Sequence, residues 1–156
     1  ILRQNLQKGG VPAEVTGLRP DQWTGQGRSF QLVLVDAPCS GQSLLCKGIR
    51  NPGCLGSAMV NGNAKRQKGI LLAITPCVAE GGHLLYTTCT YDPDENEKVV
   101  SYILRRVPGW SAVEVPSLEP FRSALADFPA YRLLPAHGCG AGGFCCLLRK
   151  TAPPAA

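Results

Sequence analysis

The stretch that most constrains the fold of this chain covers residues 32–41, with the sequence Leu-Val-Leu-Val-Asp-Ala-Pro-Cys-Ser-Gly. Its four apolar residues run without alternation into Asp36, which is typical of a strand buried on both faces of a parallel sheet. Pro38 and Gly41 indicate that the strand ends there, in a tight turn that carries Cys39. Open α/β sheets bind ligands beyond the carboxyl ends of their strands, so Asp36 and Cys39 are expected at the mouth of a site.

A second strand of the same character is predicted over residues 83–88, and Cys89 follows it directly. A helix over residues 64–78 would form the crossover between the two strands. Parallel neighbours joined in this way would place Cys39 and Cys89 side by side. The sequence therefore predicts an α/β fold in which two thiols and the Asp36 carboxylate share one pocket.

The rest of the chain supplies elements that flank these two strands. The pattern predicts a helix over 1–9, a strand over 11–15, a connector over 16–29 and a helix capped by Asp92. It further predicts a strand over 113–115, a segment over 116–135 that is largely loop with room for one helical turn, and a final strand over 144–148. The glycine cluster at 138–143 precedes a strand and opens no helix, so it is interpreted as a turn rather than a phosphate loop. Residues 151–156 are expected to be a disordered tail.

Composition excludes several classes of protein. The chain has 156 residues, 44% of them hydrophobic, which suits one globular domain. No apolar run is long enough to span a membrane and the opening is unlike a signal peptide, so we expect a cytoplasmic chain without a membrane partner. None of the eight cysteines forms a Cys-x-x-Cys pair, so no metal site is expected and most of them are interpreted as small hydrophobic residues of a reducing compartment.

The net charge of +5 indicates an anionic partner only weakly, but its distribution is more informative. Residues 37–79 contain no acidic side chain. The basic residues of this segment are Lys47, Arg50, Lys65, Arg66 and Lys68. The segment is either a solvated basic face or a surface across which a phosphate backbone lies.

A partly exposed thiolate near positive charge is a competent nucleophile. It can attack carbon 6 of a cytosine or uracil ring, after which carbon 5 is nucleophilic enough to accept a methyl group. A nearby acid or hydrogen-bonding group must stabilise the charge on the ring, and a further acid-base group must remove the proton from carbon 5. Asp36, Cys39 and Cys89 supply that set of groups.

Two motifs, Asp-Ala-Pro-Cys-Ser-Gly at 36–41 and Tyr-Thr-Thr-Cys-Thr at 86–90, are followed by Asp-Glu-Asn-Glu at 94–97. Together with Lys-Gly-Ile-Arg-Asn-Pro at 47–52, Arg-Gln at 66–67 and the closing residues 143–150, they resemble the Sun-type family of S-adenosylmethionine-dependent RNA (cytosine-5) methyltransferases. The resemblance covers about 120 residues and implies a Rossmann-like methyltransferase fold, with a mostly parallel sheet and an antiparallel last strand.

The resemblance also assigns roles to residues. Cys89 would be the nucleophile, Asp36 would contact the cytosine and the methionine end of the cofactor, and Cys39 would assist elimination of the product. Asn96 would brace the loop that carries Cys89. RNA contacts are expected from Pro38, Lys47 and Arg50. The RNA is expected to be ribosomal rather than transfer RNA, with the target base unstacked to reach the thiol.

The glycine-rich cofactor loop of that family is not recognisable in this sequence. Residues 1–150 are therefore expected to be the C-terminal part of a catalytic domain, with an incomplete sheet and weak binding of S-adenosylmethionine. Two alternatives to the enzyme are a non-catalytic RNA-binding remnant and a thiol-redox protein in which Cys39 and Cys89 form a reversible pair.

Overall fold

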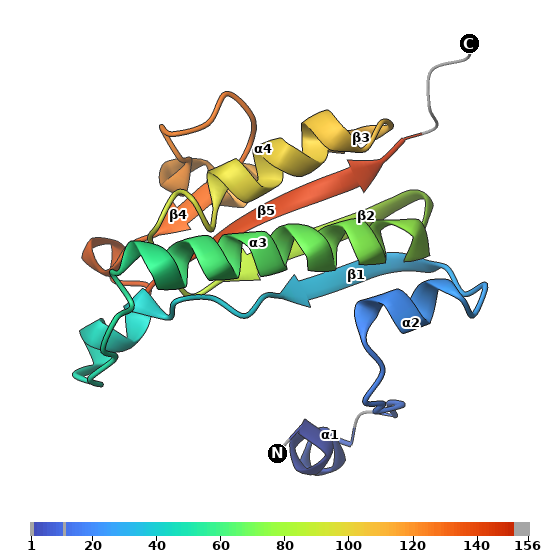
Figure 1. The fold of residues 1–156 in the computed structure, drawn as a ribbon, viewed down its shortest axis with the longest axis horizontal. Helices are drawn as coiled ribbons and strands as arrows, with labels where there is room; N and C mark the ends of the chain where they lie inside the picture. Colours follow the sequence, from blue (N-terminus) through green and yellow to red (C-terminus); the bar gives the residue numbers. More distant parts are fainter. Residues whose placement is uncertain (1, 11, 152–156) are drawn as a thin grey trace.

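The computed structural model describes residues 2–10 and 12–151, which contain one five-stranded sheet. The strand order is β1-β2-β5-β3, and β4 also pairs with β5. Strands β1 and β2 are parallel, whereas β5 is antiparallel to β2, β3 and β4. The last strand of the chain therefore runs against all the others (Figure 1). This confirms the predicted Rossmann-like arrangement of a mostly parallel sheet with an antiparallel last strand.

Two short helices precede the first strand, the longer helices α3 and α4 lie on either side of β2 in the chain, and 3₁₀ turns occur along the whole sheet-forming part. The helices are α1 (Leu2–Lys8), α2 (Pro20–Thr24), α3 (Ser57–Ile74) and α4 (Glu97–Arg106). The strands are β1 (Phe30–Asp36), β2 (Val78–Thr88), β3 (Trp110–Ala112), β4 (Tyr131–Leu133) and β5 (Gly143–Lys150). The 3₁₀ turns cover Gln42–Lys47, Thr75–Cys77, Pro116–Phe121 and Pro135–His137.

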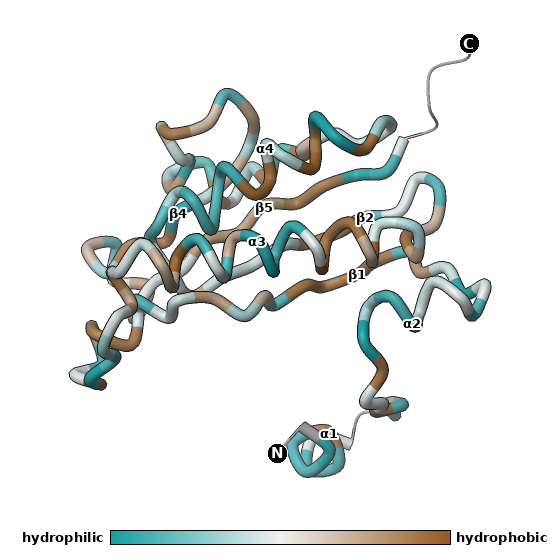
Figure 2. Tube along the Cα trace, in the orientation of Figure 1, coloured by the Kyte–Doolittle hydropathy of each residue, from teal (hydrophilic) through white to brown (hydrophobic). Residues whose placement is uncertain are grey.

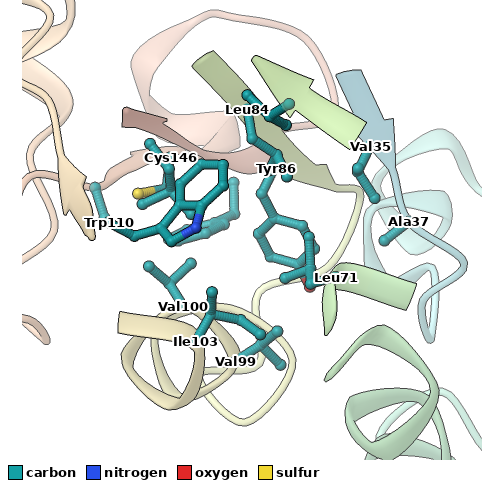
Figure 3. Packing of buried hydrophobic residues seen from close by; sticks show 14 of the residues in the cluster. Val35, Ala37, Leu71, Leu84, Tyr86, Val99, Val100, Ile103, Trp110 and Cys146 are labelled. Carbon is teal, nitrogen blue, oxygen red and sulfur yellow. The ribbon is translucent and has the colours of Figure 1, made fainter. Parts of the chain in front are cut away.

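The core lies between the sheet and the pair of helices α3 and α4, which cover the same face (Figures 1 and 3). Leu84 and Tyr86 of β2 face Leu71 of α3 and Ile103 of α4, and all four are fully buried. Hydrophobic residues are concentrated in the central strands and alternate with hydrophilic ones along α4 (Figure 2). This alternation gives α4 the apolar stripe that its sequence predicts.

Strand β1 departs from its prediction in one respect, because it is buried on one face only. Val35 is 8% exposed, whereas Leu32 and Leu34 are 61% and 62% exposed. The helices α3 and α4 cover the Val35 face, and no described element covers the side chains of Leu32 and Leu34. A run of apolar residues predicts a strand correctly but does not show which of its faces is covered.

Several element boundaries differ from those predicted. Residues 12–15 have no regular structure, and position 11 lies outside the described residues. The crossover helix begins at Ser57 rather than at residue 64. The strand predicted over 113–115 lies at Trp110–Ala112 instead, because the buried Trp110 anchors it. Of the predicted residues, Val113 continues the pairing, with its backbone N–H donating to the carbonyl of Leu147. The short elements α2 and β4 were not predicted.

The described residues contain no helix that is both long enough and apolar enough to cross a membrane. The disordered tail predicted for 151–156 lies outside the described residues from position 152 onward.

Replacing the fully buried Leu71 by alanine should lower the free energy of unfolding by about 2–5 kcal/mol, because it leaves a cavity between α3 and the sheet. The matched control is Leu55→Ala, at a leucine that is 73% exposed, which should change stability by less than about 0.5 kcal/mol. Urea denaturation followed by circular dichroism measures both values. Equal losses in the two variants would contradict the assignment of the core.

Candidate active site

The turns after β1 and β2 bring two thiols into contact, as the sequence predicts. The register pairs Asp36 with Thr87 at the ends of the two strands. Beyond that point the Sγ atoms of Cys39 and Cys89 are 3.2 Å apart. The backbone N–H of Ser43 donates to the carbonyl of Cys89 at 3.1 Å, which ties the two turns together.

Both thiols open into a cleft of about 730 Å³ at this edge of the sheet. Its walls come from the turn after β1, the first two turns of α3 and the tip of β2. The lining residues are Asp36, Ala37, Pro38, Cys39, Ser40, Gly41, Leu44, Asn51, Met59, Asn63 and Cys89. Asp36 is the one charged residue among them, so the cleft offers a single carboxylate beside two thiols.

The residues on both sides of Cys89 are fixed by Asn96. Its Oδ1 accepts a hydrogen bond from Thr88 Oγ1 at 2.6 Å, and its Nδ2 donates to the carbonyl of Thr90 at 3.1 Å. The Thr90 hydroxyl in turn lies 2.8 Å from the hydroxyl of Ser40. Asn96 is fully buried, and its contacts are those of the bracing residue that the resemblance implies.

The turn that carries Cys39 is held by a buried pair, Glu95 and Gln67, which the sequence pattern does not mark as part of the site. Glu95 Oε2 accepts hydrogen bonds at 2.9 Å from the backbone N–H of Ser40 and from Gln67 Nε2. Gln67 Nε2 also donates to the carbonyl of Pro38 at 2.9 Å. These bonds fix the backbone on both sides of Cys39.

A helix that starts directly after a cap at Asp92 would place Glu95 at its third position. Helix α4 begins at Glu97 instead, and Asp92 Oδ1 accepts from the backbone N–H of Asp94 in a local turn. Glu95 is therefore free to point inward. Its spacing from Asp92 fits both arrangements, so the sequence contained no signal that could separate them.

The two thiols have different surroundings. Cys89 is exposed, whereas Cys39 is half-buried. Burial, followed by the hydrogen bond with Cys89, raises the pKa of the Cys39 thiol to about 12. Cys39 therefore keeps its proton at neutral pH and can donate it in a hydrogen bond to the sulfur of Cys89.

The predicted RNA contacts divide into two groups. Pro38 lines the cleft beside Asp36. Lys47 ends the 3₁₀ turn Gln42–Lys47, and Arg50 lies just beyond it; both are exposed and neither lines the cleft. The structure thus brings Asp36, Pro38, Cys39 and Cys89 together and leaves the two basic residues on the neighbouring loop.

A mixed sheet with its last strand antiparallel, and with the candidate site at the ends of its two parallel strands, has the architecture of a Rossmann-like α/β domain. NSun6 from Pyrococcus horikoshii, solved with SFG, has the same fold, with a TM-score of 0.77 at 23% identity over 96% of this chain and 38% of that one. A methyltransferase homologue from the same organism gives 0.68 at 23% identity, over 95% of this chain and 48% of that one.

The sequence comparison identifies the family. The family model described as 16S rRNA methyltransferase RsmB/F matches residues 2–149, and the chain belongs to this family. A tRNA (cytosine(49)-C(5))-methyltransferase of Pyrococcus abyssi is 36% identical, over 68% of this chain and 34% of the relative. Ribosomal RNA small subunit methyltransferase B of Enterobacter sp. (strain 638) is 34% identical, over 65% of this chain and 24% of the relative. The chain thus spans about a quarter to a third of these relatives.

The raised pKa of Cys39 predicts how its alkylation depends on pH. Since the thiolate reacts and the pKa is about 12, the rate of Cys39 alkylation by iodoacetamide should rise about tenfold per pH unit from about pH 7 to pH 10 without levelling off. Peptide mass spectrometry measures this rate, with the exposed Cys139 as the internal reference. A plateau for Cys39 below pH 10 would contradict the assignment.

Proposed function

We propose that this chain carries the catalytic cleft of an S-adenosylmethionine-dependent RNA (cytosine-5) methyltransferase, with Cys89 as the nucleophile. The observation that carries the proposal is the cleft in which the exposed Cys89 thiol, the proton-bearing Cys39 thiol and the Asp36 carboxylate converge. Membership of a family whose relatives methylate RNA supports it.

In the proposed reaction the Cys89 sulfur forms a bond to carbon 6 of an unstacked cytosine, and the electron pair of the 5,6 double bond moves to carbon 5. Asp36 Oδ1 accepts a hydrogen bond from Thr87 Oγ1 at 3.3 Å, and its exposed carboxyl group is placed to contact the ring. A carboxyl group that donates a proton to the ring would neutralise the negative charge that develops there, and the resulting carboxylate could then accept a hydrogen bond from the base.

Release of the product requires the proton on carbon 5 to leave and the bond between carbon 6 and sulfur to break. Because Cys39 already holds a proton at neutral pH, we assign the removal of the carbon-5 proton to water and a different role to Cys39. Its thiol, 3.2 Å from Cys89 Sγ, donates to that sulfur as it departs and stabilises the thiolate.

The substrate is proposed to be RNA, and ribosomal RNA in preference to transfer RNA. The family description and the small-subunit relatives favour ribosomal RNA, whereas the archaeal relative is a transfer RNA enzyme. Pro38 would contact the base within the cleft, and Lys47 and Arg50 would contact phosphates on the adjoining loop. We further propose a cytoplasmic location, where such RNA substrates are found.

The described cleft matches only part of the cofactor. The Asp36 carboxylate can accept hydrogen bonds from the ammonium group at the methionine end, and no second charged residue lines the cleft. S-adenosylmethionine, when bound, supplies the methyl group. We propose that residues 1–150 are the C-terminal part of the catalytic domain and that the glycine-rich loop that holds most of the cofactor lies outside them.

That assignment predicts weak cofactor binding by the 156-residue chain. Isothermal titration with S-adenosylmethionine should show no saturation below about 1 mM, because a single carboxylate contributes little of the binding free energy. A dissociation constant in the low micromolar range would contradict the proposed extent of the domain.

The role of Cys89 can be tested without the cofactor. Addition of its thiolate to carbon 6 makes carbon 5 exchange its hydrogen with water, so RNA carrying [5-³H]cytidine should release tritium. We expect release with the wild-type chain, more from small-subunit ribosomal RNA than from transfer RNA, and none above background with Cys89→Ala. The matched control, Cys139→Ala, removes an exposed cysteine that does not line the cleft and should keep the wild-type rate.

Binding of RNA without tritium release in the wild-type chain would instead support the non-catalytic remnant. Equal release by the wild-type and Cys89→Ala chains would show that another group attacks the base.

A further inference from the structure

A second hollow, separate from the catalytic cleft, lies between the neighbouring helices α3 and α4 (Figure 1). It has a volume of about 520 Å³, and its walls come from one side of each helix and from the turn before α4. The lining residues are Asn61, Ala64, Lys65, Lys68, Gly69, Leu72, Asp94, Lys98 and Tyr102. We refer to it as the α3–α4 groove.

The α3–α4 groove carries excess positive charge. Three lysines face it against one carboxylate, and that carboxylate, Asp94, forms an ion pair with Lys98. In the part of the chain that the structure describes, no carboxylate lies within ion-pair distance of Lys65 or Lys68. Two ammonium groups are therefore available to an anionic partner.

The groove is also fixed in shape. The Nζ of Lys68 lies 5.3 Å from the centre of the Tyr102 ring, which draws the lysine towards α4. Tyr102 is held in turn by the helix that buries Val99 and Ile103 in the core. The two charges therefore stand on rigid helices rather than on a loop.

The groove and the catalytic cleft share helix α3. Met59 and Asn63 line the cleft, whereas Asn61 and Lys65, in the same two turns, line the groove. From Met59 to Lys68 the helix advances about 14 Å, since each residue adds about 1.5 Å. A strand of RNA whose base enters the cleft needs only a few nucleotides to reach Lys65 and Lys68.

We propose that the α3–α4 groove binds the phosphate backbone of the RNA segment that flanks the target cytosine. The inference rests on the proposed function and extends it by assigning the path of the substrate beyond the cleft. Lys65 and Lys68 each pair with a phosphate, and Asn61 is placed to donate to a neighbouring backbone oxygen. RNA is favoured over an acidic protein because the same helix lines the cleft that takes the base.

The test measures binding of a fluorescein-labelled single-stranded RNA containing one cytosine, by anisotropy across a series of KCl concentrations. Lys65→Gln/Lys68→Gln keeps the side-chain stems and removes both charges. At about 100 mM KCl its dissociation constant should rise about tenfold. The slope of log K against log[KCl] should fall in magnitude by about 1.4, the value for two lost contacts to a single strand.

The matched control is Arg105→Gln/Arg106→Gln, which removes the same charge from exposed residues at the far end of α4. It should leave the slope unchanged. An equal fall in both double variants, or no change in the lysine variant, would overturn the proposal. The proposal would also be overturned if polyglutamate binding depended on the two lysines and RNA binding did not. That result would assign the groove to an acidic protein.

The tritium assay keeps this proposal distinct from the proposed function. If the salt slope differs between the wild-type chain and the lysine variant but the wild-type chain releases no tritium, the proposed RNA path is supported and the proposed methyl-transfer chemistry is contradicted. Tritium release with a slope independent of the lysines would overturn the groove alone.

Discussion

The site depends on the parallel pairing of β1 with β2, in a register that ends with Asp36 opposite Thr87. A shift of one residue in either strand would turn Val35 out of the core and move the turn that carries Cys39 along the sheet. The register is fixed by the burial of alternate residues on the face that α3 and α4 cover, including Val35 and Tyr86. The hydrophobic core therefore brings the two turns that carry Cys39 and Cys89 to the same edge of the sheet.

Strand pairing alone does not determine the direction in which the turns leave the sheet. The buried polar residues fix that direction. Glu95 and Gln67 are fully buried, and each leaves one oxygen without a hydrogen-bond partner among the described residues. Burying polar atoms in this way costs free energy, which the core must offset. The gain is a rigid backbone at Pro38 and Ser40, on either side of Cys39. Tyr86 links the two layers, because its ring lies in the core and its hydroxyl donates to the carbonyl of Glu95 at 2.7 Å.

The sequence was sufficient to predict the two central strands, the crossover helix, the antiparallel last strand and the contact between Cys39 and Cys89. The two central strands, the crossover helix and the contact between the thiols follow from apolar runs that stop at distinctive turn residues, a signal that is local in sequence. The antiparallel direction of the last strand is implied by the family resemblance alone. The errors have a common cause, since each depends on contacts made elsewhere in the chain. The exposure of Leu32 and Leu34 depends on which elements cover β1, and the inward position of Glu95 depends on a backbone N–H at Ser40. Lys47 and Arg50 lie at the end of the turn Gln42–Lys47 and just beyond it, outside the lining of the cleft, and their contacts with RNA stay a prediction.

The chemistry follows from the unequal environments of two residues of the same type. Cys39 lies deeper, where burial keeps its thiol protonated, and Cys89 lies at the surface, where a base can reach it. Two equally exposed thiols would compete for the same proton and for the same carbon atom of the base. In the proposed arrangement Cys89 forms the bond to carbon, and Cys39 holds the proton. The asymmetry arises because Cys39 lies within a turn clamped by α3 and Glu95. Cys89 lies just after β2, where Asn96 braces its two neighbours and Ser43 holds its carbonyl while its thiol stays exposed. Helix α3 thus places the buried thiol through Gln67, and its opposite side offers Lys65 and Lys68 to the RNA.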